Sequence, residues 1–275
     1  MRIRVRAPAT TANLGAGFDC AAAALDLWNE LEVTQSDGEA DLRHLTVRAF
    51  ARLAPPEGRS FAFVERIPRA RGLGSSAAAI ALGLVAGAVA AGRDATPDEL
   101  LALGLELEGH PDNLAAALTG GVCLTWDGNV VRIADTAPAT PIAVVPREQV
   151  ETREARAALP EAVPHADAAF SVARAALLGA AVASGSAELF AAAADDRLHE
   201  PYRARRAPLL AAVRERLPAG ALAATLSGSG PTVVVWTRPG DGAACVEELA
   251  ERFPDADVLP LSISPSGAGP YDHSL

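Results

Sequence analysis

Residues 71–92, RGLGSSAAAIALGLVAGAVAAG, place two glycines and two serines directly before a long run of alanine and aliphatic residues. The glycines free the backbone to take conformations that other residues avoid and to approach a ligand closely. The apolar run, residues 74–91, predicts a helix that is buried on all sides. The first amides of such a helix lack partners within it, and with the helix dipole they form an anion site.

Two other interpretations of this stretch are a membrane span and a plain glycine turn with a serine N-cap. Residues 77–92 supply about sixteen uncharged positions, short of the roughly twenty that a bilayer requires. Alanine and glycine dominate them, and we find no second candidate span in the sequence. We therefore expect no membrane role. The choice between a phosphate cradle and a plain turn depends on the rest of the chain, and the G-K-[ST] ending of a Walker A loop is missing.

The bulk composition narrows the classes of function. The chain has 275 residues, half of them hydrophobic, which suits one large domain or two ordinary ones with a real core. Its formal net charge of −10 disfavours a protein that wraps nucleic acid, because such proteins are usually basic. All 24 basic residues are arginines, so neither a lysine Schiff base nor a Walker A lysine is available.

The cysteines and the N-terminal stretch bear on the compartment. Cys20, Cys123 and Cys245 are far apart and show no C-x-x-C spacing, which predicts reduced thiols rather than disulfides or a zinc site. Residues 1–15 alternate polar and apolar side chains and lack the hydrophobic core of a signal peptide. We therefore expect a cytoplasmic protein.

Strand and helix patterns are mixed along both halves of the chain. We expect strands over residues 2–6, 25–33, 45–50, 61–67, 122–126, 130–133 and 232–237. We expect helices over residues 74–91, 96–108, 114–118, 151–159, 166–184, 186–194, 208–217 and 243–252. Regular βαβ alternation and a G-x-G-x-x-G after the first strand are missing, so the pattern favours an α+β fold over a Rossmann sheet.

The division into domains is predicted from a proline-rich stretch, residues 137–146, which leads into a new strand. We place the boundary there, between an N-terminal domain over residues 1–140 and a C-terminal domain over residues 141–275. The tail, residues 264–275, is rich in small and turn-forming residues, and we expect it to be loose.

Three short motifs follow one another along the chain: PATTANLGAGFD at 8–19, GLGSSAAA at 72–79 and LSGSGPTVVV at 226–235. In this order and at these distances they resemble the signature stretches of the GHMP kinases, the family named for galactokinase, homoserine kinase, mevalonate kinase and phosphomevalonate kinase. Residues 105–122, 152–160 and 200–208 are similar to further segments of the homoserine kinase branch. The resemblance covers nearly the whole chain.

The resemblance implies a two-domain GHMP kinase fold. Its N-terminal, ATP-binding domain would be similar to ribosomal protein S5 domain 2, its C-terminal domain would be ferredoxin-like, and the active site would lie between them. It implies transfer of phosphate from ATP, with Mg²⁺, to the side-chain hydroxyl of L-homoserine. The product would be O-phospho-L-homoserine, on the way to threonine. A homodimer is expected because relatives are often dimers.

The resemblance also implies which residues hold the nucleotide. The phosphates would be bound by the glycine-serine loop and the first helical turn: Arg71, Gly72, Leu73, Gly74, Ser75, Ser76 and Ala77. Mg²⁺ takes oxygen ligands, which are typically a carboxylate, a hydroxyl, phosphates and water. By similarity Glu108 would be the carboxylate and Ser76 the hydroxyl. Taken alone, Glu108 would be expected to be a solvated helix acid.

Homoserine carries an ammonium and a carboxylate, which require opposite charges in the site. By the resemblance Asp19 would bind the ammonium. Arg156 and Arg203 would bind the carboxylate, because a guanidinium fork matches carboxylate geometry. Arg205 or Arg206 could take the place of Arg203.

Phosphoryl transfer mostly requires positioning and charge neutralisation. The resemblance points to transfer without a dedicated base, with Asn113 as the catalytic residue near the acceptor hydroxyl and Asp112 as a possible general base. Asn13 and Thr152 would also contact the substrate, and His110 would orient its loop. The glycine-rich turn at 227–230 either supports the phosphate loop or substrate, or simply precedes a strand.

Two alternative functions stay open. One is another GHMP kinase, acting on mevalonate, shikimate or a diphosphocytidyl-methylerythritol-type acceptor. Asp19 with two downstream arginines favours a zwitterionic amino acid over these anions. The other is a nucleotide-binding regulator without catalysis, against which the presence of Ser76, Glu108 and Asn113 argues.

Overall fold

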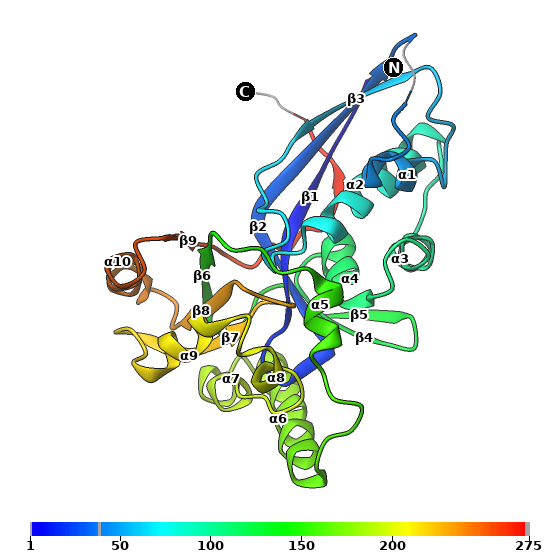
Figure 1. The fold of residues 1–275 in the computed structure, drawn as a ribbon. Helices are drawn as coiled ribbons and strands as arrows, with labels where there is room; N and C mark the ends of the chain where they lie inside the picture. The colour runs from blue at the N-terminus through cyan, green and yellow to red at the C-terminus, as the bar shows by residue number, and fades with distance from the viewer. Residues whose placement is uncertain (1, 38–39, 273–275) are drawn as a thin grey trace.

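The computed structural model describes residues 2–37 and 40–272 of the chain. Its helices and strands form two regions, each built on one antiparallel sheet (Figure 1). Strands and helices are mixed in both regions, so the expected α+β class is confirmed. Residues 273–275, the end of the tail that was expected to be loose, lie outside the described residues.

The first sheet is built around a long hairpin of β1 (Arg2–Asn13) and β2 (Gly17–Gln35). Both strands are longer than the segments 2–6 and 25–33 that alternation predicted. Residues 7–13 and 21–25 are buried without interruption. A strand covered on both faces has no alternation to detect, because both of its faces are apolar.

Three more strands complete this part of the sheet. β4 (Val122–Trp126) pairs with β2 and turns through Asp127 and Gly128 into β5 (Asn129–Ala134), so the strands expected over 122–126 and 130–133 are confirmed and form a hairpin. β3 (Arg59–Val64) pairs with the other end of β2.

Residues 45–50 form a helix, α1 (Leu45–Phe50), where we expected a strand. His44 begins this helix, and its side chain accepts a hydrogen bond from the amide of Thr46 at 3.3 Å. Four of its six residues are buried. A short apolar run has too few positions to separate a helical from an extended period, so the prediction was wrong for lack of signal.

The helix α2 (Ser75–Ala90) crosses the middle of the first region and is buried along most of its length, as expected. Its glycines allow other backbones to approach. A Cβ on Gly83 would collide with the carbonyl oxygen of Thr46, and one on Gly87 would lie 2.7 Å from that of Phe50. The small residues of the apolar run therefore let α1 pack directly against α2.

Two further helices lead toward the site. α3 (Pro97–Leu105) starts with a capping box, in which Thr96 and Glu99 exchange hydrogen bonds between side chain and backbone. α4 (Pro111–Thr119) follows after a short turn and packs on β1 and β2.

The second sheet has four strands. In spatial order they are β7 (Ala221–Leu226), β8 (Val233–Thr237), β6 (Thr140–Pro146) and β9 (Ala256–Pro260). The helix α9 (Pro208–Glu215) packs on β7, and α10 (Gly242–Arg252) packs on β6 and β9.

Two helices join the regions. α6 (His165–Ser184) contacts β2 and β5 of the first sheet, and its neighbour α7 (Ala187–Ala193) contacts β7 of the second. The short helices α5 (Thr152–Ala157) and α8 (Glu200–Arg203) lie near each other (Figure 1), and Arg206, just after α8, donates to the carbonyl of Glu154 in α5 at 2.9 Å.

The C-terminal tail returns to the first sheet, so the expectation that it is loose was wrong for residues 264–272. The amide of Gly121 donates to the carbonyl of Ser264 at 2.7 Å, and that of Ala268 donates to Ala117 at 2.7 Å. β10 (Gly269–Pro270) then pairs with β1. Composition missed this because the tail is held largely by backbone hydrogen bonds to residues far away along the chain, which composition does not reveal.

The chain passes from the first sheet to the second between β5, which ends at Ala134, and β6, which starts at Thr140. We propose the domain boundary near residue 140 on this ground. The returning tail means that residues 264–272 pack with the N-terminal region although they follow the C-terminal one.

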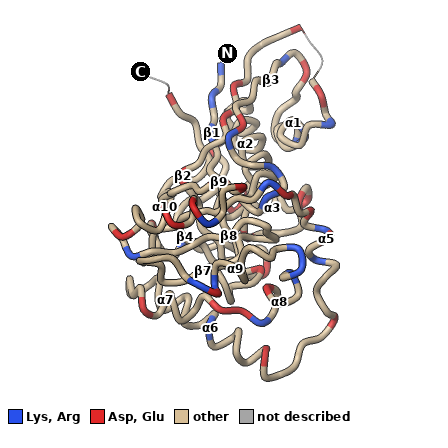
Figure 2. Tube along the Cα trace, turned by 60° about the vertical axis from the view of Figure 1, so that its left-hand side comes forward, with Lys and Arg blue, Asp and Glu red and all other residues tan. Residues whose placement is uncertain are grey.

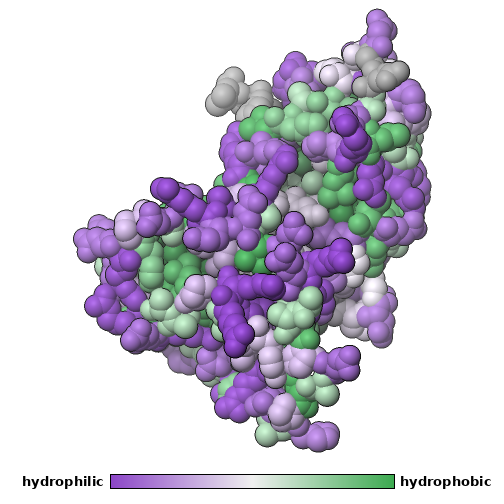
Figure 3. Space-filling view, in the orientation of Figure 1, coloured by the Kyte–Doolittle hydropathy of each residue, from purple (hydrophilic) through white to green (hydrophobic). Residues whose placement is uncertain are grey.

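Among the described residues, α6 is the one helix long and apolar enough, by length and composition, to cross a membrane; α2 is shorter. The expectation that no second candidate span exists was therefore wrong. Nine of the twenty residues of α6 are alanine, which gains little on leaving water. Figure 3 shows hydrophilic and apolar residues interspersed over the face of the molecule that includes α6, without a continuous apolar belt on that face.

Candidate active site

A cavity of about 350 Å³ lies where the two regions meet. Most of the residues predicted for the site line it: Asn13, Asp19, Gly72, Gly74, Ser75, Ser76, Glu108, Asp112, Asn113, Thr152, Arg156 and Arg203. His110, Glu151 and the turn at 228–230 line it as well. Ala70, Val150 and Arg153 also line it, and no motif singled them out.

The glycine-serine loop forms the floor of the cavity. Gly72 and Gly74 have φ of +83° and +66°, in the left-handed region that favours glycine. A Cβ on Gly72 would collide with the carbonyl oxygen of Ser227, and one on Gly74 with the hydroxyl of Thr10. Both the backbone conformation and the close packing therefore require glycine at these two positions.

The helix α2 begins at this loop with free amides. Gly74 is its N-cap, and no side chain among the described residues caps it. The first intrahelical bond runs from the amide of Ala78 to the carbonyl of Gly74. The amides of Ser75, Ser76 and Ala77 therefore precede the first intrahelical bond, which is the arrangement of an anion site.

Three predicted phosphate-loop residues lie outside the described lining of the cavity. The side chain of Leu73 is buried, and its carbonyl accepts from the amide of Thr10 at 3.2 Å. Ala77 is buried in the first turn of α2. The guanidinium of Arg71 donates to the carbonyl of Arg147 at 3.1 Å. Leu73 and Arg71 therefore hold the loop in place, through a backbone carbonyl and a guanidinium respectively.

The turn at residues 227–230 holds the glycine-serine loop against β1. The hydroxyl of Ser227 lies 2.6 Å from the carbonyl oxygen of Gly72 and 2.9 Å from the hydroxyl of Thr11. The amide of Gly228 donates to the carbonyl of Ala12 at 3.1 Å. Of the two roles left open for this turn, the structure supports the one in which it holds the loop.

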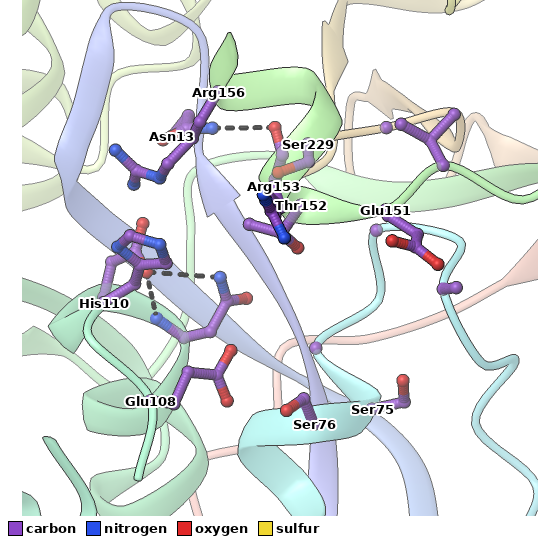
Figure 4. Close-up of a pocket in the computed structure, with 18 of the residues that line it drawn as sticks. Asn13, Ser75, Ser76, Glu108, His110, Glu151, Thr152, Arg153, Arg156 and Ser229 are labelled. Atoms are coloured by element: carbon purple, nitrogen blue, oxygen red, sulfur yellow. Dashed lines mark hydrogen bonds between the residues drawn. The ribbon is translucent and has the colours of Figure 1, made fainter. Parts of the chain in front are cut away.

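Glu108 faces Ser76 across the cavity (Figure 4). Burial raises the pKa of the Glu108 carboxyl, and a hydrogen bond with the Ser76 hydroxyl partly opposes that effect. Its Oε2 is buried without a hydrogen-bond partner among the described residues. A solvated helix acid would have neither property.

This pair fits a Mg²⁺ ion. Within the described residues there is no group of three or more His, Cys, Asp and Glu side chains that could hold a metal by themselves. Mg²⁺ at a nucleotide needs no such group, because phosphates and water supply most of its ligands. An orphaned carboxylate oxygen next to a hydroxyl and an anion cradle is a suitable donor set.

Asn113 and Asp112 form a fixed unit at the start of α4. One oxygen of Asp112 accepts from the amide of Asn113 at 2.6 Å and from its Nδ2 at 3.2 Å (Figure 4). The Oδ1 of Asn113 accepts from the hydroxyl of Thr10 at 2.6 Å. Burial raises the pKa of Asp112 to about 6.

Asp19 and Arg156, predicted to bind opposite ends of the substrate, bind each other. Two hydrogen bonds of 2.9 and 2.6 Å join the guanidinium to the two carboxylate oxygens. The amide of Asp19 donates to the Oδ1 of Asn13, whose Nδ2 donates to the carbonyl of Gly228. Asn13 therefore connects the turn that carries Asp19 to the second region of the protein.

Arg203 is the arginine of segment 200–208 that the structure brings to the cavity. It is buried, and its Nη1 donates to the carbonyl of Gly228 at 3.1 Å. Arg205 and Arg206 line a separate cavity beside Leu209. Figure 2 shows arginine-bearing segments next to the labels of α5 and α8, the elements that carry Arg156 and Arg203.

Comparison with known proteins gives consistent results. Models of the GHMP kinases N terminal domain and the GHMP kinases C terminal domain match residues 42–121 and 173–255. A homoserine kinase of Streptomyces avermitilis is 44% identical, over 94% of this chain and 96% of that protein. One from Streptomyces coelicolor is 43% identical, over 90% and 88%. The crystal structure of homoserine kinase from Cytophaga hutchinsonii superposes with a TM-score of 0.84 at 25% identity, over 98% of this chain and 97% of that one.

The chain therefore belongs to the GHMP kinase family, and its two-domain fold is the fold of that family. Within the family, these relatives are homoserine kinases, the branch that its sequence motifs resemble. Acceptors of the mevalonate, shikimate or diphosphocytidyl-methylerythritol type are not favoured.

Proposed function

We propose that the protein transfers the γ-phosphoryl group of ATP to the side-chain hydroxyl of L-homoserine, giving ADP and O-phospho-L-homoserine. The observation that carries this proposal is the composition of one cavity. It joins an anion cradle at the start of α2 to a carboxylate, Asp19, and two guanidinium groups, Arg156 and Arg203. The relatives that align over nearly the whole chain support the same activity.

The phosphates of ATP would lie on the amides of Ser75, Ser76 and Ala77. These backbone donors are fixed before the nucleotide arrives, so no reorganisation is needed when charge moves along the phosphate chain. Mg²⁺ would be held by Glu108 and Ser76, and when bound it neutralises charge on phosphate oxygens. The orphaned oxygen of Glu108 is what supports this assignment.

The nucleoside end of ATP would occupy a neighbouring cavity of about 290 Å³. Ser75 and Ser76 line both cavities, so the two cavities adjoin at the start of α2. His44, which stacks on Phe63 with ring centres 4.2 Å apart, and Leu45 provide ring and aliphatic surfaces in this second cavity.

L-Homoserine would enter by exchanging partners with the Asp19–Arg156 ion pair. Its ammonium would take the place of Arg156 at Asp19, and its carboxylate would take the place of Asp19 at Arg156, with Arg203 alongside. A zwitterion satisfies both charges. An acceptor with a carboxylate alone would leave Asp19 without a partner, and an unpaired, partly buried charge is costly. This exchange favours an amino acid over mevalonate.

The acceptor hydroxyl would be placed by Asn113, with Asn13 and Thr152 forming the surrounding wall. We propose transfer without a dedicated base. Asp112 would act chiefly on Asn113, because one of its oxygens already accepts two hydrogen bonds from that residue. Its pKa of about 6 keeps it available as a base at neutral pH, so the pH profile of a variant decides between these roles.

The proposal is tested by offering purified protein Mg-ATP with a panel of acceptors and following ADP release. We expect strong turnover with L-homoserine, little with mevalonate or shikimate, and little with 4-hydroxybutyrate, which is homoserine without its ammonium. Equal turnover with 4-hydroxybutyrate would contradict the role given to Asp19. A protein that binds ATP but turns over none of these acceptors would instead be a regulator.

We also propose that the protein is a cytoplasmic homodimer. Val172 on α6 is 66% exposed, and alanines at 169, 173 and 176 lie on the same exposed side of the helix, a face suited to contact with a second copy. Light scattering after size-exclusion chromatography measures the mass directly. A mass of about 28 kDa, that of one chain, would contradict the dimer.

A further inference from the structure

His199 is completely buried just behind the wall of the cavity, and both of its ring nitrogens have partners. Its Nε2 lies 3.0 Å from the carbonyl oxygen of Gly15, in the turn between β1 and β2. Its Nδ1 lies 3.1 Å from the Nη1 of Arg203, one helical turn further along the chain. The ring also stacks on Phe18, with centres 5.0 Å apart.

The partners determine which nitrogen carries the proton. A carbonyl oxygen only accepts, so the hydrogen must be on Nε2, which donates to Gly15. A guanidinium only donates, so Nδ1 must present its lone pair to Arg203. The neutral ring with its proton on Nε2 satisfies both contacts. Burial lowers the pKa of His199 to about 4, which agrees with a neutral ring.

Arg203 is thereby held on one side of its guanidinium. The same Nη1 also donates to the carbonyl of Gly228, and the group lies over the Phe18 ring at 5.3 Å. Its Nε has no partner among the described residues, although Arg203 lines the cavity. The hydrogen bonds therefore gather at Nη1, and the buried Nε keeps an unused donor on the opposite edge of the guanidinium.

We propose that His199 is a positioning residue: its ring lies between the Gly15 carbonyl and Arg203 and fixes the orientation of the Arg203 guanidinium. The free edge of that guanidinium then meets the substrate carboxylate. This inference rests on the proposed function, in which Arg203 binds that carboxylate. A bidentate contact depends on the orientation of the planar fork, and its charge alone does not provide it. Loss of His199 should therefore weaken acceptor binding and leave nucleotide binding intact.

The test compares two substitutions that treat the ring differently. His199→Phe keeps a ring to stack on Phe18 but removes both hydrogen bonds, and we expect the KM for L-homoserine to rise about tenfold or more. His199→Gln retains one donor and one acceptor and should restore the KM to within about threefold of wild type. KM for ATP should change less than twofold in both. His165→Gln, on the exposed start of α6, is the matched control.

A second measurement separates positioning from a general loss of structure. The amino diol formed by reducing the carboxyl group of homoserine has no carboxylate for Arg203, so we expect its kcat/KM to be the same in wild type and in His199→Phe. An equal loss with both acceptors, or a rise in KM for ATP as large as that for homoserine, would overturn the inference. If His199→Phe is too unstable to assay, His199→Asn, whose shorter amide cannot span both contacts, takes its place.

The two proposals fail in different ways. If the proposed function is wrong, the wild-type protein will not phosphorylate L-homoserine. If only the inference about His199 is wrong, the wild-type protein will be active and substitution of His199 will not change the KM for homoserine. A double variant with Arg203→Gln completes the test: removing His199 should have no further effect on KM once Arg203 is gone.

Discussion

The two ends of the cavity are built in different ways. The phosphate end comes from one continuous segment, residues 72–77, and presents backbone amides at the start of a buried helix. The acceptor end brings together Asp19, Arg156 and Arg203, which are far apart in sequence, and presents charged side chains that already have partners. We propose that the first end is rigid and binds phosphates generally, and that the second end exchanges its partners and provides specificity.

The largest effect should come from Gly74→Ala, which changes the backbone at the phosphate end of the cavity. An alanine at this position would have to adopt φ of +66°, and its Cβ would collide with the hydroxyl of Thr10. We expect the loop to move as a result, together with its three amides. Because each such donor is worth about 100-fold or more in rate, we expect kcat/KM for ATP to fall by about 1000-fold. Steady-state kinetics with varied ATP measures this.

Gly92→Ala is the matched control for that variant. Gly92 has nearly the same φ, +62°, but nothing lies within 4 Å of its Cβ position. We expect a stability loss of roughly 1 kcal/mol from the backbone conformation and no loss of kcat/KM. Equal kinetic losses in both variants would show that backbone strain, and not the displaced cradle, is responsible.

The next effect should come from Glu108→Gln, which removes the carboxylate charge next to Ser76. We expect kcat to fall by about 100-fold and half-saturation to require more Mg²⁺, because one charged ligand of the ion is lost. A titration of rate against Mg²⁺ concentration measures both quantities. Glu106→Gln, on an exposed side chain paired with Arg52, should leave both unchanged. An unaltered Mg²⁺ requirement in Glu108→Gln would remove Glu108 from the metal site.

At the exchangeable end, Asp19→Asn should raise the KM for L-homoserine about 30-fold, since a charged hydrogen bond contributes about 2 kcal/mol. The KM for ATP should stay within about twofold. The control is Asp167→Asn, on α6, which breaks the ion pair of Asp167 with Arg197. A parallel rise in both KM values would mean that Asp19 supports the fold of the cavity and does not bind the ammonium.

The smallest effect concerns Asp112, whose pKa rises on folding from 3.8 to about 6. Its carboxyl therefore destabilises the folded protein as pH rises from 4 through 6, because the unfolded chain loses the proton more readily. We expect Asp112→Asn to gain stability relative to wild type by about 2 kcal/mol between pH 4.5 and pH 7.5, measured by urea unfolding. A constant difference would contradict the raised pKa.

The same variant tests catalysis. Without a dedicated base, Asp112→Asn should lower kcat by about tenfold, through looser placement of Asn113, and should not change the shape of the pH profile. Loss of an acid limb near pH 6 in the variant, together with a fall in kcat of about 1000-fold or more, would make Asp112 the general base.

The sequence predicts several local elements well, but it does not predict the contacts between distant segments that shape the cavity. The cap formed by Thr96 and Glu99, the helix after Gly74 and the β4–β5 hairpin each depend on neighbours within a few positions, so a local pattern specifies them. The motifs also named Asp19 and Arg156, but no local signal could show that they bind each other across 137 positions.

The errors have the same cause. Residues 45–50 are helical because α2 offers glycines against which α1 packs, and the tail is ordered because Gly121 and Ala117 supply hydrogen-bond partners. The contact of His199 with the Gly15 carbonyl spans 184 positions. In each case the determining partner lies far away along the chain, where a pattern within one window cannot reveal it.

A crystal structure with a non-hydrolysable ATP analogue and L-homoserine tests the account most directly. We predict that phosphate oxygens lie within hydrogen-bonding distance of the amides of Ser75, Ser76 and Ala77. We also predict that the Asp19–Arg156 pair has opened, with the ammonium at Asp19 and the carboxylate at Arg156. Phosphates bound elsewhere, or an intact ion pair with homoserine in the cavity, would contradict it.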